Sequence, residues 1–212
     1  MENIAFGFID PYTGEYASFI EVDKFWDGED MLDIHCDGVI YLKKDDKYYR
    51  RVLKNGVANL AWYGVKSGDD IHEAISSAIG TVGVNGTIFI PSGTYHCSDT
   101  IYIKTSSITI VGESGYPAVT GRATRIEFAP GIDGIFIQSY TFGGAAPMTS
   151  IRGSGCRLQK LSIIGPGKTD TEVANHDLFE EVGRLPSGMI IFDQCHLEDI
   201  EVGGFPGSGI RY

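Results

Sequence analysis

Apolar residues recur with a helical period in one short segment of the chain. In "SGDDIHEAISSAIG" (67–80) they stand at positions 71, 74, 75, 78 and 79, which predicts one amphipathic helix over residues 70–79. We expect Asp70 to cap its start, Glu73 to complete a capping box, and Gly80 to end it. A helix this short is marginal in water alone, so its apolar stripe must cover other apolar residues.

Elsewhere the apolar residues follow a strand period, in short runs that end at glycine. "SITIVG" (107–112), "CRLQKLSIIG" (156–165) and "CHLEDIEVGG" (195–204) form one set, and "GIFI", "GMII" and "GIRY", starting at 134, 188 and 209, form another. Within the first set the last two segments align position by position. The aligned pairs are Cys156 with Cys195, Leu158 with Leu197, Leu161 with Ile200, and Ile163 with Val202.

Two strand types that alternate with a repeat of about 20–25 residues are typical of a solenoid. Side chains alternate along a strand, so some members of each run should stack inward and others outward. The expected inward residues are Ile108, Ile110, Leu161, Ile163, Ile200 and Val202, and the expected outward ones are Thr109, Ser162 and Glu201. This pattern predicts an all-β parallel β-helix, and the helix at 70–79 is placed to cap its N-terminal end.

The first coil of this solenoid is expected in "GTIFIPSGTY" (86–95). A strand at 87–90 should end at a corner made by Pro91-Ser92-Gly93, and a strand of new direction should start at Thr94. Residues 1–57 differ from the rest. "DGVIYLKKDDKYYRRVLKNG" (37–56) predicts two strands joined by the polar "KKDDK" turn, so we expect a small N-terminal β module and a β-helix over 58–212.

Several ordered motifs after residue 58 resemble the pectate-lyase-like superfamily. They are "WYGVK" (62–66), the pair Asp69-Asp70, "GTIFIPSGTY" (86–95) and "ITIVG" (108–112). The usual Lys-Gly-Asp-Gly-x-x-Asp-Asp motif is shortened here to "KSGDD" (66–70). The resemblance implies a right-handed parallel β-helix. The segment 37–56 is similar to the short β modules that precede such helices in bacteriophage tailspikes and related bacterial surface proteins.

Tailspikes of this kind are typically homotrimers that bind and depolymerise bacterial surface polysaccharide by hydrolysis or lyase chemistry. The resemblance therefore implies a tailspike-type depolymerase in the virion tail, attached to a tail or baseplate protein through residues 1–57. Two alternatives stay open: a non-catalytic shaft, adaptor or adhesin, and a bacterial pectate-lyase-like enzyme. The repeat is interrupted at Tyr212, which leads us to expect a longer parent chain.

Composition and motif content reduce the number of possible binding partners and cofactors. The formal charge of -11 disfavours binding to nucleic acid and to anionic membranes, and the first residues lack the pattern of a signal peptide. Four scattered cysteines without a CxxC pair are expected to be free thiols, with Cys156 and Cys195 stacked on neighbouring coils. No nucleotide or flavin motif is present in the sequence, so we expect no cofactor.

Cleavage of a glycosidic bond needs paired carboxylates, or a base with a cation. The densest cluster is in "FDQCHLEDIEV" (192–202), so Asp193, Glu198 and Glu201 are the candidate catalytic residues. The alternative interpretation is a row of solvated surface charges. The candidate substrate-binding residues lie in two loops and one coil further on: His176, Asp177, Tyr140 and Arg211.

One further segment has metal-ligand residue types. "DIHCD" (33–37) holds two aspartates, Asp33 and Asp37, with His35 and Cys36, but on a strand the cysteine would face away from the histidine. No second cluster supplies the missing ligands, so we expect no metal site.

Overall fold

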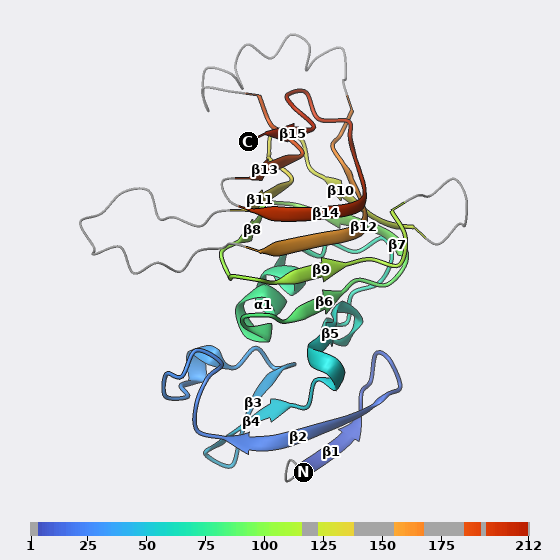
Figure 1. Ribbon diagram of the computed structural model, residues 1–212. Coiled ribbons are helices and arrows are strands. Elements are labelled where there is room, and N and C mark those ends of the chain that lie inside the picture. Colours follow the sequence, from blue (N-terminus) through green and yellow to red (C-terminus); the bar gives the residue numbers. More distant parts are fainter. Residues whose placement is uncertain (1–3, 116–122, 138–154, 168–184, 192–193, 212) are drawn as a thin grey trace, which may run out of the picture.

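The computed structural model describes residues 4–115, 123–137, 155–167, 185–191 and 194–211 (Figure 1). Within these residues an antiparallel sheet forms the N-terminal part, and three rows of short parallel strands with a single α-helix form the rest. None of the described helices is long and apolar enough to cross a membrane.

The N-terminal sheet has the strand order β1-β2-β4-β3. Its strands are β1 (Ile4–Ile9), β2 (Tyr16–Val22), β3 (Tyr41–Lys44) and β4 (Lys47–Arg51). The predicted hairpin over 37–56 is confirmed, and Asp45 and Asp46 at its tip both have the positive φ values of a tight hairpin turn. The β1–β2 hairpin was not predicted, because its strands do not alternate cleanly between apolar and polar residues.

Helix α1 (His72–Val82) is shifted by about two residues from its predicted position. The predicted capping box is wrong: no side chain caps the helix, and Glu73 is fully exposed. Asp70 instead lies before the helix, where its Oδ1 accepts hydrogen bonds from the backbone N–H groups of His72 and Ser98. Gly80 does not end the helix, which continues to Val82 and stops at Gly83 with φ 79°.

The first row of parallel strands starts directly after the N-terminal module. It contains β5 (Val57–Asn59), β6 (Thr87–Phe89), β9 (Thr109–Val111) and the first halves of β12 (Cys156–Ile164) and β14 (Cys195–Gly203). These strands lie above one another in Figure 1, with the N-terminal sheet beyond β5. β6 ends at Phe89, one residue before the predicted end of this strand at residue 90.

The second and third rows follow from the first through short corners. The second row contains β7 (Gly93–Cys97), β10 (Thr124–Phe128) and the second halves of β12 and β14. The third row contains β8 (Ile101–Ile103), β11 (Ile135–Ile137), β13 (Met189–Ile191) and β15 (Ile210–Arg211). The predicted strands that start near residues 134, 188 and 209 belong to the third row, whereas the other predicted set is divided between the first and second rows. The predicted pairs between 156–165 and 195–204 match the observed register.

Strands β12 and β14 each bend once, and the bend divides them between two rows. Lys160 and Asp199 have φ values of 56° and 53° at equivalent positions. Before the bend Leu158 pairs with Ile110, and after it Ile163 pairs with Ile126. The predicted equivalence of Ile110 with Leu161 and Ile163 is therefore wrong: Ile110 stacks on Leu158, one row away from Leu161 and Ile163.

One apolar core lies inside the three rows and continues into α1. Isoleucines from all three rows are fully buried there, together with Ile71 and Ile75 of the helical segment. Each such side chain contributes roughly 1.5–3 kcal/mol to stability. Ile200 and Val202 are partly buried but pack against this core as predicted. Ser162 was expected to face outward into solvent, yet it is fully buried because Glu201 of the next strand lies over it.

The fold is thus mostly β with one helix, and its parallel sheets are compatible with the predicted β-helix. The right-handed sense, the closed solenoid and the capping role of α1 stay predictions. Cys156 and Cys195 pair in register as free thiols, as expected, with Cys156 buried and Cys195 partly exposed.

Candidate functional site

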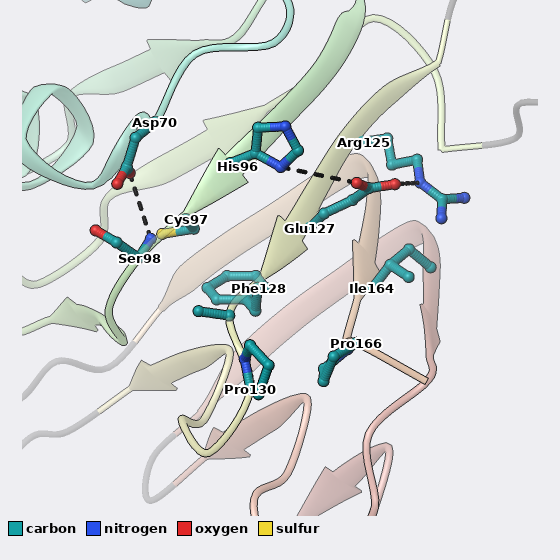
Figure 2. A pocket seen from close by; sticks show the side chains of 12 residues that line it. Asp70, His96, Cys97, Ser98, Arg125, Glu127, Phe128, Pro130, Ile164 and Pro166 are labelled. Atoms are coloured by element: carbon teal, nitrogen blue, oxygen red, sulfur yellow. Dashed lines mark hydrogen bonds and ion pairs between the residues drawn. The ribbon is translucent and has the colours of Figure 1, made fainter. Parts of the chain in front are cut away.

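A groove runs across the outer surface of the second row, where β7 and β10 present charged side chains (Figure 2). Its volume is about 500 Å³. Asp70, His96, Arg125 and Glu127 form its polar wall, and Phe128, Pro130, Ile164 and Pro166 form its apolar wall. We call it the row-two groove.

Strand alternation determines which residues reach the groove. Tyr95 and Ile126 point into the core, so their neighbours on β7 and β10 point outward. The register pairs His96 with Glu127, while Arg125 is two residues before Glu127 on the same face. Three chemically active side chains are therefore held on neighbouring parallel strands whose backbone is fixed by ladder hydrogen bonds.

Glu127 is the centre of the polar wall. Arg125 Nε donates a hydrogen bond of 2.7 Å to Glu127 Oε1, and His96 Nδ1 lies 3.8 Å from Glu127 Oε2. The His96 side chain is 58% exposed and that of Glu127 is 34% exposed, so both are reachable from solvent. Arg125 fixes the orientation of the carboxylate, and one Glu127 oxygen faces the imidazole.

Asp70 extends this row by one position, since it forms a parallel bridge with His96. Burial raises the pKa of Asp70, but hydrogen bonds from Ser98 and His72 outweigh that effect and hold the pKa below its ordinary value. Asp70 and Glu127 stand one strand to either side of His96. Two strand spacings place their Cα atoms roughly 9–10 Å apart.

This arrangement offers two kinds of chemistry. Carboxyl groups about 6.5–9.5 Å apart are typical of inverting glycoside hydrolysis, in which one carboxyl acts as acid and the other as base. A histidine base beside an arginine is suited instead to removing a proton next to a carboxylate or carbonyl and stabilising the resulting charge. The first would use the carboxyl groups of Glu127 and Asp70, and the second the imidazole of His96 with the guanidinium of Arg125.

The predicted catalytic glutamates lie outside the groove and on opposite sides of the β14 bend. Glu198 precedes Asp199 and accepts a hydrogen bond of 2.5 Å from Gln159 Nε2. Glu201 follows the bend and accepts one of 2.5 Å from Ser162 Oγ. On β12, therefore, each glutamate is paired with an amide or a hydroxyl rather than with a second carboxylate.

Of the other predicted residues, Arg211 is the one that the structure describes. Arg211 lies on β15 in the third row, opposite Ile190 of β13. Asp193, His176, Asp177 and Tyr140 lie outside the described residues. The catalytic and binding roles assigned to all of these residues stay predictions.

Sequence reasoning missed the groove residues. His96 and Glu127 stand far apart in the chain, and each is a single charged residue between buried ones. The available signal was the alternation in "GTYHC" (93–97) and "TRIEF" (124–128), which places His96, Arg125 and Glu127 outward. It could not supply the register between the two strands.

The segment 33–37 has structural contacts instead of an open ligand set. Asp37 Oδ1 accepts three backbone hydrogen bonds, and its Oδ2 accepts hydrogen bonds from Tyr63 and Thr81. Asp33 is bound to Lys43 and Tyr48, and His35 Nδ1 accepts from the backbone of Leu32. Across the part of the chain that the structure describes, no group of three metal-ligating side chains is present.

Comparison with known proteins supports the resemblance read from the motifs. Residues 58–154 match the profile of the family described as "Rhamnogalacturonase A/epimerase, pectate lyase-like". This confirms a pectate-lyase-like segment in the chain. No curated protein matches.

One solved structure that is similar to the chain is a protein titled ORF18 of Geobacillus virus E2. The two share 18% identity with a TM-score of 0.48, and the match covers 76% of this chain and 32% of the viral protein. The chain thus spans about a third of that protein's length.

Proposed function

We propose that this chain is a section of a phage tailspike-type protein that binds bacterial surface polysaccharide in the row-two groove and cleaves it there. The observation that carries this proposal is the outward cluster of His96, Arg125 and Glu127 in an open groove. The cluster lies within the residues that match the pectate-lyase-like profile. The side chains of His96 and Glu127 are 58% and 34% exposed, so a glycan outside the protein can reach them.

In this proposal Glu127 exchanges a proton with the reacting sugar, and the hydrogen bond from Arg125 orients its carboxyl group. His96 is the second proton-transfer group, on the neighbouring strand. In hydrolysis Asp70 would supply the second carboxyl. In lyase cleavage His96 would remove the proton and Arg125 would stabilise the negative charge that develops.

A non-catalytic adhesin or shaft is the second candidate. It is favoured by the hydrogen bond between Arg125 and Glu127, because this contact already occupies one carboxylate oxygen of Glu127. In this case the groove would hold the polysaccharide without cutting it. Assembly as a homotrimer, attachment to a tail or baseplate protein through residues 1–57, and location in the virion belong to either candidate.

Incubation of the purified protein with capsular polysaccharide, exopolysaccharide and O-antigen tests the proposal. New reducing ends without ultraviolet absorbance of unsaturated sugar would identify a hydrolase, and both signals together a lyase. Glu127→Gln and His96→Ala should each lower the rate by about 10²–10⁴-fold, the usual contribution of a general acid or base.

The matched control is Glu198→Gln, an equally conservative change outside the groove, which should keep the wild-type rate. Binding without cleavage would favour the adhesin. Cleavage that survives Glu127→Gln and His96→Ala would overturn the assignment of the groove as the reaction site.

A further inference from the structure

A second cavity lies where the N-terminal sheet meets the first parallel strands, away from the row-two groove. Its volume is about 630 Å³, within the usual range of about 300–1,000 Å³ for small-molecule sites. Three aromatic residues line it: Tyr16 of β2, Trp62 of the short helix η3 (Leu60–Tyr63), and Phe89 on the outer face of β6. We call it the junction cavity.

Trp62 is held in place from two directions. The Arg51 guanidinium lies over its ring, 3.6 Å from the centroid, and its Nε1 donates a hydrogen bond of 3.1 Å to Glu15 Oε2. An aromatic ring fixed before a ligand arrives loses little conformational entropy on binding. The side chain is thus preorganised for contact with a ligand.

The residue that holds Trp62 is itself held by an unusual contact. Arg51 Nη1 forms a salt bridge of 2.8 Å with Asp10, and the two side chains are only 4% and 3% exposed. Burying an ion pair costs desolvation energy that the Coulomb attraction rarely exceeds, so such a pair is weak as a stabilising device. Here it does have a positional effect, because it places a cation directly on the Trp62 ring.

Polar groups in the cavity wall are balanced in charge. The Asp10 carboxylate neutralises Arg51, and Lys54 and Glu15 carry opposite charges. Asn55 and Asn59 add side-chain amide groups, and Asn59 Oδ1 accepts a hydrogen bond from the backbone N–H of Ala61. Aromatic rings with a carboxylate and amides around them match the apolar faces and hydroxyl groups of a sugar ring. Charge balance favours a neutral sugar over an acidic one.

We propose that the junction cavity is a carbohydrate-binding site for a neutral glycan segment, separate from the row-two groove. Trp62 and Phe89 contact the sugar rings, and Glu15 accepts hydrogen bonds from their hydroxyl groups. The site binds and does not cleave, so the inference holds whether or not the groove is catalytic.

Intrinsic fluorescence offers a direct test, because the chain has only two tryptophans, Trp26 and Trp62. In a Trp26→Phe background the signal reports Trp62 alone. Maltohexaose, cellohexaose and N-acetylchitohexaose serve as neutral probes. We expect at least one of them to change the fluorescence saturably, and Glu15→Gln or Phe89→Ala to weaken its binding about tenfold or more.

Two controls keep the outcome interpretable. Glu29→Gln changes an exposed glutamate outside the cavity and should leave the affinity unchanged, as should Glu127→Gln in the groove. Saturation-transfer NMR on the wild-type chain gives the same information should Trp26→Phe fail to fold, since Trp26 also bonds Gly80. Absence of binding by all three probes, or equal binding by Glu15→Gln and Phe89→Ala, would overturn the proposal. Cleavage assays with groove variants test the proposed function of the row-two groove and not binding in the junction cavity, so failure of one proposal is distinguishable from failure of the other.

Discussion

The N-terminal sheet and the parallel rows are held together by different kinds of contact. In the N-terminal sheet a few polar side chains connect distant segments, as Asp10 does with Arg51 and as Asp37 does with Tyr63 and Thr81. In the parallel rows, stacked aliphatic residues such as Ile110 on Leu158 repeat the same contact from strand to strand. The first region thus combines small apolar clusters with single polar links whose loss would leave a buried group unpaired, whereas the second repeats one kind of apolar contact.

This difference indicates at which positions functional side chains can be introduced without a loss of stability. The inward positions of the rows are fixed by packing, so the outward positions are free to carry charge, as in the row-two groove. In the N-terminal sheet the same polar residues both hold the structure and shape the junction cavity. Substitutions there should alter stability and binding together, and substitutions of outward row residues should alter binding alone.

The largest effect is expected from Asp10→Asn, which leaves the Arg51 guanidinium buried without its counter-charge. Removing one partner of such a pair costs about 3–5 kcal/mol of unfolding free energy. Urea unfolding at neutral pH measures it, and Asp23→Asn, at an exposed aspartate in the same N-terminal part, is the matched control. A loss no greater than that of the control would show that the buried Arg51 guanidinium does not depend on the Asp10 counter-charge.

The same residue predicts a dependence on pH. Burial raises the pKa of Asp10, but hydrogen bonds from Arg51, Thr13 and Tyr12 outweigh it and hold the pKa below its ordinary value. The contribution of ionised Asp10 to the free energy of unfolding is therefore complete above its unfolded-state pKa of about 3.9. It is lost as the pH falls through the lower pKa of the folded state. The wild-type protein should lose stability below about pH 4 more steeply than Asp10→Asn.

A smaller loss is expected when one member of an aliphatic stack is shortened. Leu158→Ala removes a fully buried side chain between Ile110 and Leu197 and should cost about 2–5 kcal/mol. Gln159→Ala, at the neighbouring outward position, should stay within about 0.5 kcal/mol. Similar losses for the two variants would contradict the assignment of inward and outward faces.

The smallest effect, and a gain, is expected at the bend of β12. Lys160 has a φ of 56°, a conformation that costs a non-glycine residue about 1 kcal/mol, so Lys160→Gly should raise stability by up to that amount. Asp199→Gly should gain less, because aspartate tolerates this region better. Gln159→Gly, at a position with extended backbone, should lower stability, because glycine there only adds conformational freedom to the unfolded chain. A gain in stability for Gln159→Gly would contradict the explanation by positive φ.

Much of the parallel part could be predicted because repeated sequence segments that align with one another also pair as neighbouring strands. Cys156 aligns with Cys195 and Leu161 with Ile200 in the sequence, and the same residues are paired between β12 and β14. The N-terminal hairpin at 37–56 was predicted from its polar turn. The ends of α1 were not, because Asp70 bonds Ser98 as well as His72, and Trp26 packs on Gly83 at the other end. Both are contacts between distant segments.

The site was harder to predict than the fold for the same reason. Clustering along the sequence pointed to Glu198 and Glu201, but the bend at Asp199 separates them. His96 and Glu127 are distant in the sequence and become neighbours only through the pairing of β7 with β10. A pair of polar side chains formed across two strands leaves no local signal in the sequence beyond alternation.

Equilibrium binding of a surface polysaccharide to two matched variants tests the central claim most directly. Calorimetric titration would compare Glu127→Gln, inside the row-two groove, with Glu198→Gln, outside it. The account predicts that Glu127→Gln weakens binding about tenfold or more while Glu198→Gln keeps the wild-type affinity. Weakened binding by Glu198→Gln with unchanged binding by Glu127→Gln would contradict it and return the site to β14.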